Sequence, residues 1–264
     1  MKLRISLAQT NVKSGEVERN LERALIMTQK AAEQGSDIVL LPELWSSGYD
    51  LQNRQLYSQQ NITIIEQLCK AARQRHLIIG GSIIEEKMGN FYNTFVLINS
   101  EGKIQAKYSK IHLFTLMEED KFLQPGDSLQ IASFPFGNAG LAVCYDLRFP
   151  EMFRSYAVKD VGLILLCAQW PAKRAYHWQT LLRARAIEDQ LFFAAVNCVG
   201  QDGAYVFAGN SAIISPWGET IIEASGTQEE LVTGEIDLGQ VTEVRRTMTV
   251  LLDRRPDLYG AVRT

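Results

Sequence analysis

The chain has 264 residues, of which 46% are hydrophobic and 22% charged, and its formal net charge at pH 7 is −3. This length is near the upper limit for one undivided hydrophobic core, so we expect a single domain over residues 1–264. A weakly negative chain has no large basic field, which argues against a nucleic-acid partner.

The cysteines and the N-terminus suggest where the protein works. The four cysteines form no CxxC pair, and none has a histidine at zinc-finger spacing, so no metal site is expected. The first residues lack the long apolar core and cleavage site of a signal peptide, and no apolar run reaches the ~18 residues that span a bilayer. We therefore expect a cytoplasmic protein without a membrane partner, whose thiols are reduced and free to react.

The N-terminal half alternates short apolar runs with amphipathic segments. Apolar runs predict strands at Leu3–Ala8, Ile38–Leu41 and Leu77–Ile84. Apolar residues three and four positions apart predict helices over 15–34 and 61–75. A hairpin is indicated by the turn residues 99–102, with strands at Tyr92–Ile98 and Lys103–Lys107.

The C-terminal half continues the alternation. Buried strands are expected at Leu141–Val143, Leu163–Cys167 and Phe192–Asn197. Helices are expected from Pro150 to about Val158, over 175–189 and over 238–248. A second hairpin surrounds Pro216–Gly218, with strands at Ser211–Ile214 and Thr220–Glu223, and the charged tail Arg254–Thr264 is expected to be irregular. The whole pattern predicts an α/β layer architecture with mixed sheets.

Cys144 is the first candidate for chemistry. An apolar strand runs directly into it and a helix follows, so its thiol is expected at the carboxyl end of a strand near a helix N-terminus. Such a position lowers thiol pKa and offers backbone N–H groups to an oxyanion. A structural thiol is the alternative, and position alone favours it, because most free cysteines are core residues.

Two charged residues occupy comparable places. Glu43 follows Pro42 at the end of the predicted strand that contains Leu40 and Leu41. It is interpreted either as a surface residue or as a buried general base. Lys110 lies among apolar residues, where its charge needs a partner unless its amine reaches water. For each of them alone, the surface reading is preferred. A Cys–His dyad of Cys144 with His112 is a further alternative, which we rank below a set of Glu43, Lys110 and Cys144.

Three segments, in this order, resemble the signature segments of the nitrilase superfamily of carbon–nitrogen hydrolases: Leu40–Glu43, Lys107–Phe114 and Cys144–Glu151. The resemblance covers nearly the whole chain. It extends to the segments Ala8–Thr10, Leu182–Glu188 and Ser215–Gly218. Together, these motifs reverse the preference for the surface and structural readings.

The resemblance implies a role for each matching residue. Glu43 would be the general base, Lys110 the electrostatic stabiliser and Cys144 the nucleophile. Glu119 matches the second glutamate of the family, although the adjacent Glu118 is an alternative. The backbone N–H of Tyr145 would stabilise the oxyanion.

The same resemblance implies the fold and the assembly. The expected fold is an α-β-β-α sandwich of two mixed sheets flanked by helices. No cofactor is implied. Members of the family pair through helices beside the active site, so a homodimer or a larger homo-oligomer is expected. The Arg183, Arg185 and Glu188 cluster would form surface or dimer-interface ion pairs.

Finer features suggest the substrate. The pair Tyr145-Asp146 is similar to the amidase branches, whereas true nitrilases usually carry Trp-Glu there. The run Cys167–Arg174 resembles omega-amidases, which hydrolyse the terminal amide of 2-oxo acids such as 2-oxoglutaramate or 2-oxosuccinamate. Such a substrate needs a cation for its distal carboxylate, and Arg174 is our candidate. Trp170 and Tyr49 are candidate pocket walls.

Other functions remain open at this point. One alternative is an amidase of deaminated glutathione, and another is an N-carbamoyl amine hydrolase of the same superfamily. A catalytically silent binding module is a more remote alternative, against which the intact Glu43, Lys110 and Cys144 argue.

Overall fold

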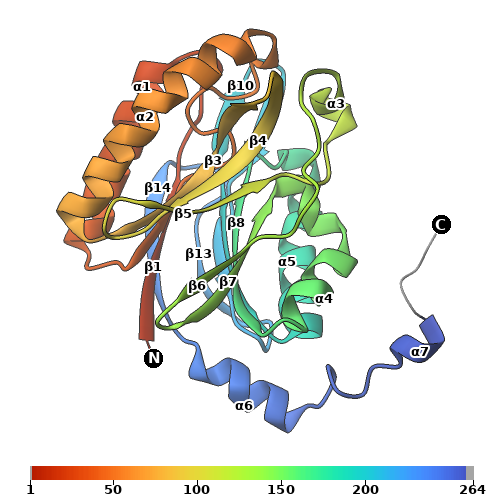
Figure 1. Cartoon of the computed structure of the whole chain (residues 1–264). Helices are drawn as coiled ribbons and strands as arrows, with labels where there is room; N and C mark the ends of the chain where they lie inside the picture. The colour runs from red at the N-terminus through yellow and green to blue at the C-terminus, as the bar shows by residue number, and fades with distance from the viewer. Residues whose placement is uncertain (1, 260–264) are drawn as a thin grey trace.

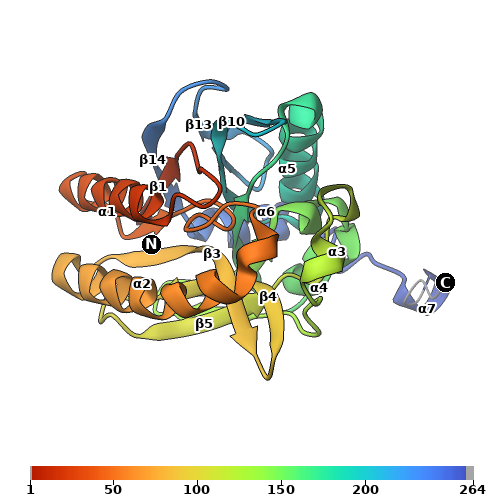
Figure 2. The same ribbon diagram turned by 90° about the horizontal axis from the view of Figure 1, so that it is seen from above.

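The computed structural model describes residues 2–259. Two six-stranded mixed sheets pack against each other, with helices on their outer sides (Figure 1). Helices α1 and α2 lie on one side, and α4 and α5 lie on the other, which is also seen from above (Figure 2). The predicted α-β-β-α sandwich is confirmed. Among residues 2–259, no helix combines the length and apolar character that crossing a bilayer requires.

The first sheet has the strand order β14-β1-β2-β3-β4-β5. Strand β2 pairs in parallel with β1 and β3, and the other neighbours are antiparallel. The bounds of its strands are β1 (Lys2–Gln9), β2 (Ile38–Leu40), β3 (Ile78–Lys87), β4 (Asn90–Ile98), β5 (Ile104–Ser109) and β14 (Glu230–Asp237).

The second sheet has the order β13-β12-β9-β8-β7-β6, and β8 pairs in parallel with β7 and β9. Its strands are β6 (Ile131–Phe134), β7 (Gly137–Val143), β8 (Val161–Ala168), β9 (Phe192–Asn197), β12 (Ala212–Ile214) and β13 (Thr220–Glu223). A separate antiparallel ribbon is formed by β10 (Val199–Asp202) and β11 (Tyr205–Ala208).

The helices connect and cover these sheets. Their bounds are α1 (Val17–Glu33), α2 (Arg54–Arg75), α3 (Glu119–Phe122), α4 (Pro150–Ala157), α5 (Ala175–Asp189), α6 (Gly239–Thr247) and α7 (Pro256–Tyr259). Short 3-10 turns occur at Leu51–Asn53, Thr115–Met117, Cys144–Arg148 and Ala172–Arg174.

Strand β2 shows why the core strands read as continuous apolar runs. Ile38 and Leu40 belong to the core cluster shared by both sheets, whereas Val39 and Leu41 pack in the cluster beneath α1 and α2. Successive side chains of a strand point to opposite faces, and both faces of this strand are buried. The strand therefore ends inside the molecule, and the residues that follow it, including Glu43, are buried.

Several elements differ from the prediction, each for a physical reason. Helix α2 begins at Arg54 rather than 61, because its first two turns are mostly polar and lack an apolar stripe. Strands β6, β10, β11 and β14 were not predicted; β14, for example, is partly exposed and owes its shape to pairing with β1. The tail, expected to be irregular, contains the single helical turn α7, which begins at Pro256. Residues 260–264 of that tail lie outside the described residues.

The packing of β8 generates a stability prediction. Leu165 is fully buried in this strand, between β7 and β9. We expect Leu165→Ala to lower the free energy of unfolding by about 2–5 kcal/mol, because it leaves a cavity in a close-packed core. Urea unfolding at fixed protein concentration measures this. The control is Leu56→Ala on α2, where the side chain is 52% exposed and a change within about 0.5 kcal/mol is expected. Equal losses in the two variants would contradict the assignment of the core.

Candidate active site

Four candidate residues come together, three from the ends of separate strands and one from the start of a helix. Glu43 follows β2, Lys110 follows β5, Cys144 follows β7 and Glu119 begins α3. The side chains of Glu43, Lys110 and Glu119 have no exposed surface. Lys110 Nζ lies 2.8 Å from Glu43 Oε1 and 2.6 Å from Glu119 Oε2. The ammonium group therefore bridges two carboxylates inside the core.

The charges of this cluster depend on one another. Burial alone would lower the pKa of Lys110, but the carboxylates of Glu119 and Glu43 raise it well above its usual value, so it stays an ammonium. Burial raises the pKa of Glu119, Lys110 opposes this shift, and Glu43 adds to it. In their ionised forms the three groups carry one net negative charge, which makes the site suited to accept a proton.

Glu43 is held by donors on every side. Its Oε1 accepts hydrogen bonds from the Tyr49 hydroxyl at 2.9 Å and from Asn93 Nδ2 at 2.8 Å, as well as from Lys110. Its Oε2 accepts the backbone N–H of Gln169 at 2.8 Å. Burial, with Glu119 and Glu43 nearby, raises the pKa of Tyr49 well above its usual value, so this hydroxyl remains a donor. The Glu43 carboxylate is thus fixed in one orientation.

The geometry distinguishes the two adjacent glutamates. Glu119 is buried, and its Oε2 accepts the backbone N–H of Phe114 at 2.6 Å besides the Lys110 ammonium. Glu118 is exposed and pairs with Lys121 at 2.6 Å. Of the two, only Glu119 takes part in the buried cluster.

Cys144 occupies a strained turn. Its φ of 46° lies in the left-handed region, which typically costs a non-glycine residue about 1–2 kcal/mol. Asp146 stabilises the turn, because its Oδ2 accepts the Val143 N–H at 2.9 Å and the Tyr108 hydroxyl at 2.8 Å. The turn therefore begins at Cys144, directly after β7.

The thiol rests in its protonated form. Burial raises the pKa of Cys144 well above its usual value, and the charge of Glu43 and a hydrogen bond to it raise it further, whereas Lys110 opposes the shift. The general expectation that a helix N-terminus lowers this pKa is not met here, because burial beside a carboxylate outweighs it. A nucleophile at this position needs a base at the moment of attack.

His112 is committed to a different partner. Its Nδ1 lies 2.8 Å from Asp146 Oδ1, and its ring stacks on Phe149 with the centroids 3.7 Å apart. Because His112 is bound to Asp146, which also stabilises the turn, these contacts favour Glu43 over His112 as the base for Cys144.

A narrow pocket opens beside the thiol. Cys144, Tyr145, Phe114 and Trp170 line it, together with the side chains of Arg148 and Arg174. The sequence pointed to Trp170 and Arg174 here. Arg148 was missed, although it lies inside the segment that carries the resemblance. Tyr49, expected as a wall, instead donates its hydroxyl to Glu43 and, at 3.3 Å, to Glu119.

Three further residues support the site, although the sequence predicted this role for none of them. Asn93 projects from β4 and donates to both Glu43 and Glu119, at 2.8 and 3.1 Å. Asp146 holds the turn. Arg185, expected on the surface or at an interface, is buried; it donates to the carbonyl groups of Leu147 at 3.2 Å and Arg148 at 3.3 Å.

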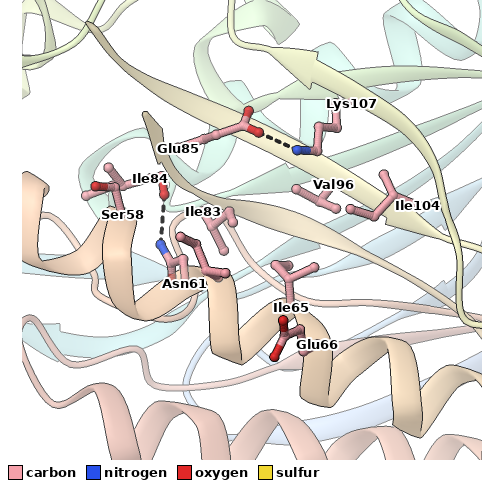
Figure 3. Close-up of a pocket in the computed structure, with 11 residues that line it drawn as sticks. Ser58, Asn61, Ile65, Glu66, Ile83, Ile84, Glu85, Val96, Ile104 and Lys107 are labelled. Atoms are coloured by element: carbon pink, nitrogen blue, oxygen red, sulfur yellow. Dashed lines mark hydrogen bonds and ion pairs between the residues drawn. The ribbon is translucent and has the colours of Figure 1, made fainter. Parts of the chain in front are cut away.

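A second pocket lies on the side of the first sheet that α2 covers. It is an apolar cavity of about 270 Å³ between α2 and strands β3 to β5, lined in part by Ile65, Ile83 and Val96 (Figure 3). Figure 3 shows two acidic residues in this pocket, of which Glu85 is paired with Lys107 and Glu66 projects from α2. It contains no thiol, and we assign it no part in the reaction. Among residues 2–259, no group of three or more His, Cys, Asp or Glu side chains is arranged to hold a metal ion.

The sequence profile described as carbon-nitrogen hydrolase matches residues 4–246. The chain belongs to the carbon–nitrogen hydrolase family. This hydrolase is 37% identical over 261 residues to the 2-oxoglutaramate amidase of Bacillus subtilis (strain 168), covering 98% of this chain and 100% of that protein. It is 35% identical over 268 residues to human omega-amidase NIT2, with 97% and 96% covered. The prediction of an amidase-type enzyme is confirmed.

Solved structures agree with this family. One is XC1258 of Xanthomonas campestris, a CN-hydrolase superfamily protein with an arsenic adduct in the active site; the TM-score is 0.89 at 32% identity, covering 97% of this chain and 98% of that one. Another is a mutant amidase from Nesterenkonia sp. AN1 with the acetamide moiety of fluoroacetamide on its active-site cysteine. Its TM-score is 0.89 at 27% identity, with 99% and 97% covered.

The buried cluster generates a prediction about stability and pH. We expect Lys110→Met to lower the free energy of unfolding at pH 8 by about 3–5 kcal/mol, because it leaves two buried carboxylates without their cation. In this variant Glu119 loses the cation that opposes the rise in its pKa, so the pKa of this carboxyl lies further above that of the unfolded chain. The folded variant therefore takes up a proton as the pH falls, and its deficit should shrink between pH 8 and pH 5.

Urea unfolding across that pH range measures the effect. Lys103→Met is the control, since Lys103 forms only an exposed ion pair with Glu101, and it should behave like the unmodified protein. A deficit that is independent of pH, or no larger than that of the control, would contradict the charge assignment.

Proposed function

We propose that this hydrolase cleaves the terminal amide of small 2-oxo acid omega-amides, such as 2-oxoglutaramate or 2-oxosuccinamate, through a thioester on Cys144. The observation that carries the proposal is the Cys144 thiol on its strained turn, beside the buried Glu43–Lys110–Glu119 cluster. The active-site cysteine named for the Nesterenkonia amidase supports the choice of nucleophile.

In the first half-reaction, Glu43 removes the proton from the thiol as the sulfur attacks the amide carbon. The new S–C bond leaves the carbonyl oxygen negative. The Lys110 ammonium and the Tyr145 N–H stabilise this oxyanion, and one such donor is typically worth about 3 kcal/mol. Glu43 then passes the proton to the nitrogen, the C–N bond breaks and ammonia leaves. Because the resting thiol is protonated, proton transfer and attack are coupled.

In the second half-reaction, Glu43 takes a proton from a water molecule, which attacks the thioester carbon. The same donors hold the second oxyanion. The S–C bond then breaks, and the proton on Glu43 returns to the sulfur. Glu119 keeps Lys110 in place throughout, at 2.6 Å. The sum is amide plus water giving a carboxylic acid and ammonia.

The substrate class follows from the pocket and the relatives. The names of the Bacillus subtilis and human relatives specify 2-oxoglutaramate amidase and omega-amidase. Such substrates carry a carboxylate at the end remote from the amide. Arg174 lines the pocket and would bind that carboxylate, since a guanidinium fork matches carboxylate geometry. Trp170 lines the same pocket. Tyr49 would orient the catalytic carboxylates, because its hydroxyl donates to Glu43 and Glu119.

We also propose that residues 1–264 work as one domain within a cytoplasmic homodimer. One core cluster contains residues of both sheets, which supports a single domain. The exposed side chains of Tyr176, Ile187 and Trp217 lie on and beside α5, the helix that begins directly after Arg174, which supports pairing through this face. All four cysteines are free, which suits a reducing compartment.

Replacing the nucleophile tests the mechanism. Cys144→Ala should lower the release of ammonia from 2-oxoglutaramate at least about 10³-fold, because no thioester can form. The matched control is Cys69→Ala, which alters a half-buried thiol on α2 and should keep full activity. Surviving turnover in Cys144→Ala with an unchanged melting temperature would refute Cys144 as the nucleophile.

A panel of substrates tests the specificity. We expect kcat/KM for the release of ammonia to be higher with 2-oxoglutaramate and 2-oxosuccinamate than with deaminated glutathione. No carbon dioxide should be released. Preference for the glutathione analogue, or carbon dioxide released with ammonia from N-carbamoyl amines, would assign the enzyme to another branch of the family.

A further inference from the structure

Two arginine side chains line the pocket of the proposed nucleophile, and their guanidinium groups lie over its aromatic walls, Arg148 over Trp170 and Arg174 over Phe114. Arg148 comes from the 3-10 turn Cys144–Arg148, and Arg174 ends the turn Ala172–Arg174 before α5. Both line the same pocket as Cys144. The two arginines are thus brought together from segments 26 residues apart, although like charges repel.

Neither guanidinium is neutralised by the protein. Within residues 2–259, no Asp or Glu forms an ion pair with Arg148 or Arg174, and no carboxylate lines the pocket. Burial lowers the pKa of Arg148, and the charge of Arg174 lowers it further, whereas Tyr145 and Cys144 act in the opposite direction. Two cations without a counter-charge in a half-buried pocket create a site for an anion.

The arginines are also held in position. The Arg148 guanidinium stacks 4.7 Å from the ring centroid of Trp170, and its Nη2 lies 3.3 Å from His177 Nδ1. Trp170 Nε1 in turn donates to the carbonyl oxygen of Arg174 at 2.8 Å, so one indole touches both arginines. Arg185 also donates a hydrogen bond to the backbone carbonyl oxygen of Arg148. A fork held by stacking loses little entropy when it binds a ligand.

We propose that Arg148 is a specificity-determining residue, which forms with Arg174 a two-guanidinium site for the 2-oxo carboxylate end of the substrate. This inference rests on the proposed function. A 2-oxo acid offers a carboxylate and a neighbouring carbonyl oxygen, all of them acceptors. A 2-amino acid places an ammonium at the same carbon, where two cations repel it and no carboxylate receives it. The pair therefore excludes glutamine and asparagine while admitting their 2-oxo counterparts.

The first test needs no turnover. Cys144 is alkylated with iodoacetate, an anion, and with iodoacetamide, its neutral analogue, and the Cys144→Ala background is subtracted. The ratio of the two rates should fall about 10-fold or more in Arg148→Gln and in Arg174→Gln, and less in Arg148→Lys, which keeps the charge. Arg19→Gln removes an equal charge from the exposed face of α1 and should leave the ratio unchanged. Melting temperatures verify that each variant is folded.

The second test uses turnover. The ratio of kcat/KM for 2-oxoglutaramate to that for glutamine should fall about 10-fold or more in Arg148→Gln, mainly through KM, because the lost interaction binds the remote end of the substrate. Ratios equal to those of the unmodified protein in a folded Arg148→Gln variant would overturn the proposal. If the unmodified protein hydrolyses neither amide while the alkylation ratio still falls, the anion site stands and the proposed function fails.

Discussion

Lys110 Nζ lies within 2.8 Å of Glu43 and within 2.6 Å of Glu119, and none of the three side chains has any exposed surface. An isolated charge at this depth would cost several kcal/mol, so each group is tolerable only while the others are present. The strands must therefore meet in one register, since β2 delivers the glutamate and β5 the lysine. Asn93 and Tyr49 complete the cluster with donors to both carboxylates. The fold and the reacting centre share this constraint.

The turn at Cys144 positions the thiol beside the charged cluster. Its left-handed backbone is supported by Asp146, which also holds His112 and Tyr108. The thiol is consequently close to Glu43, and burial beside this carboxylate raises its pKa well above the usual value. The same 3-10 turn carries Arg148, four residues after Cys144, so the proposed nucleophile and the group proposed to bind the remote end of the substrate lie on one short segment. Such coupling would let the scaffold set the distance between the two ends of the substrate.

The sequence was most informative for elements whose burial is visible in the local pattern of apolar residues. Strands buried on both faces, such as Phe192–Asn197, are continuous apolar runs and were predicted with the observed bounds. Strand β14 and the first turns of α2 were missed, because their shape comes from distant partners rather than from local periodicity. The resemblance led to Glu43, Lys110, Glu119 and Cys144. Asn93 gave no signal, since one polar residue in a strand looks the same whether it faces solvent or a carboxylate. The stacking of Arg148 on Trp170 likewise exists only in three dimensions.

The proposed reaction passes an acyl group through Cys144 beside this cluster. The most direct measurement is mass spectrometry of the enzyme quenched in acid during turnover of 2-oxoglutaramate, followed by peptide mapping. The account predicts a mass increase equal to the substrate less ammonia, located on Cys144 and absent once the substrate is consumed. An unmodified Cys144 throughout turnover, or the acyl group on another residue, would contradict it.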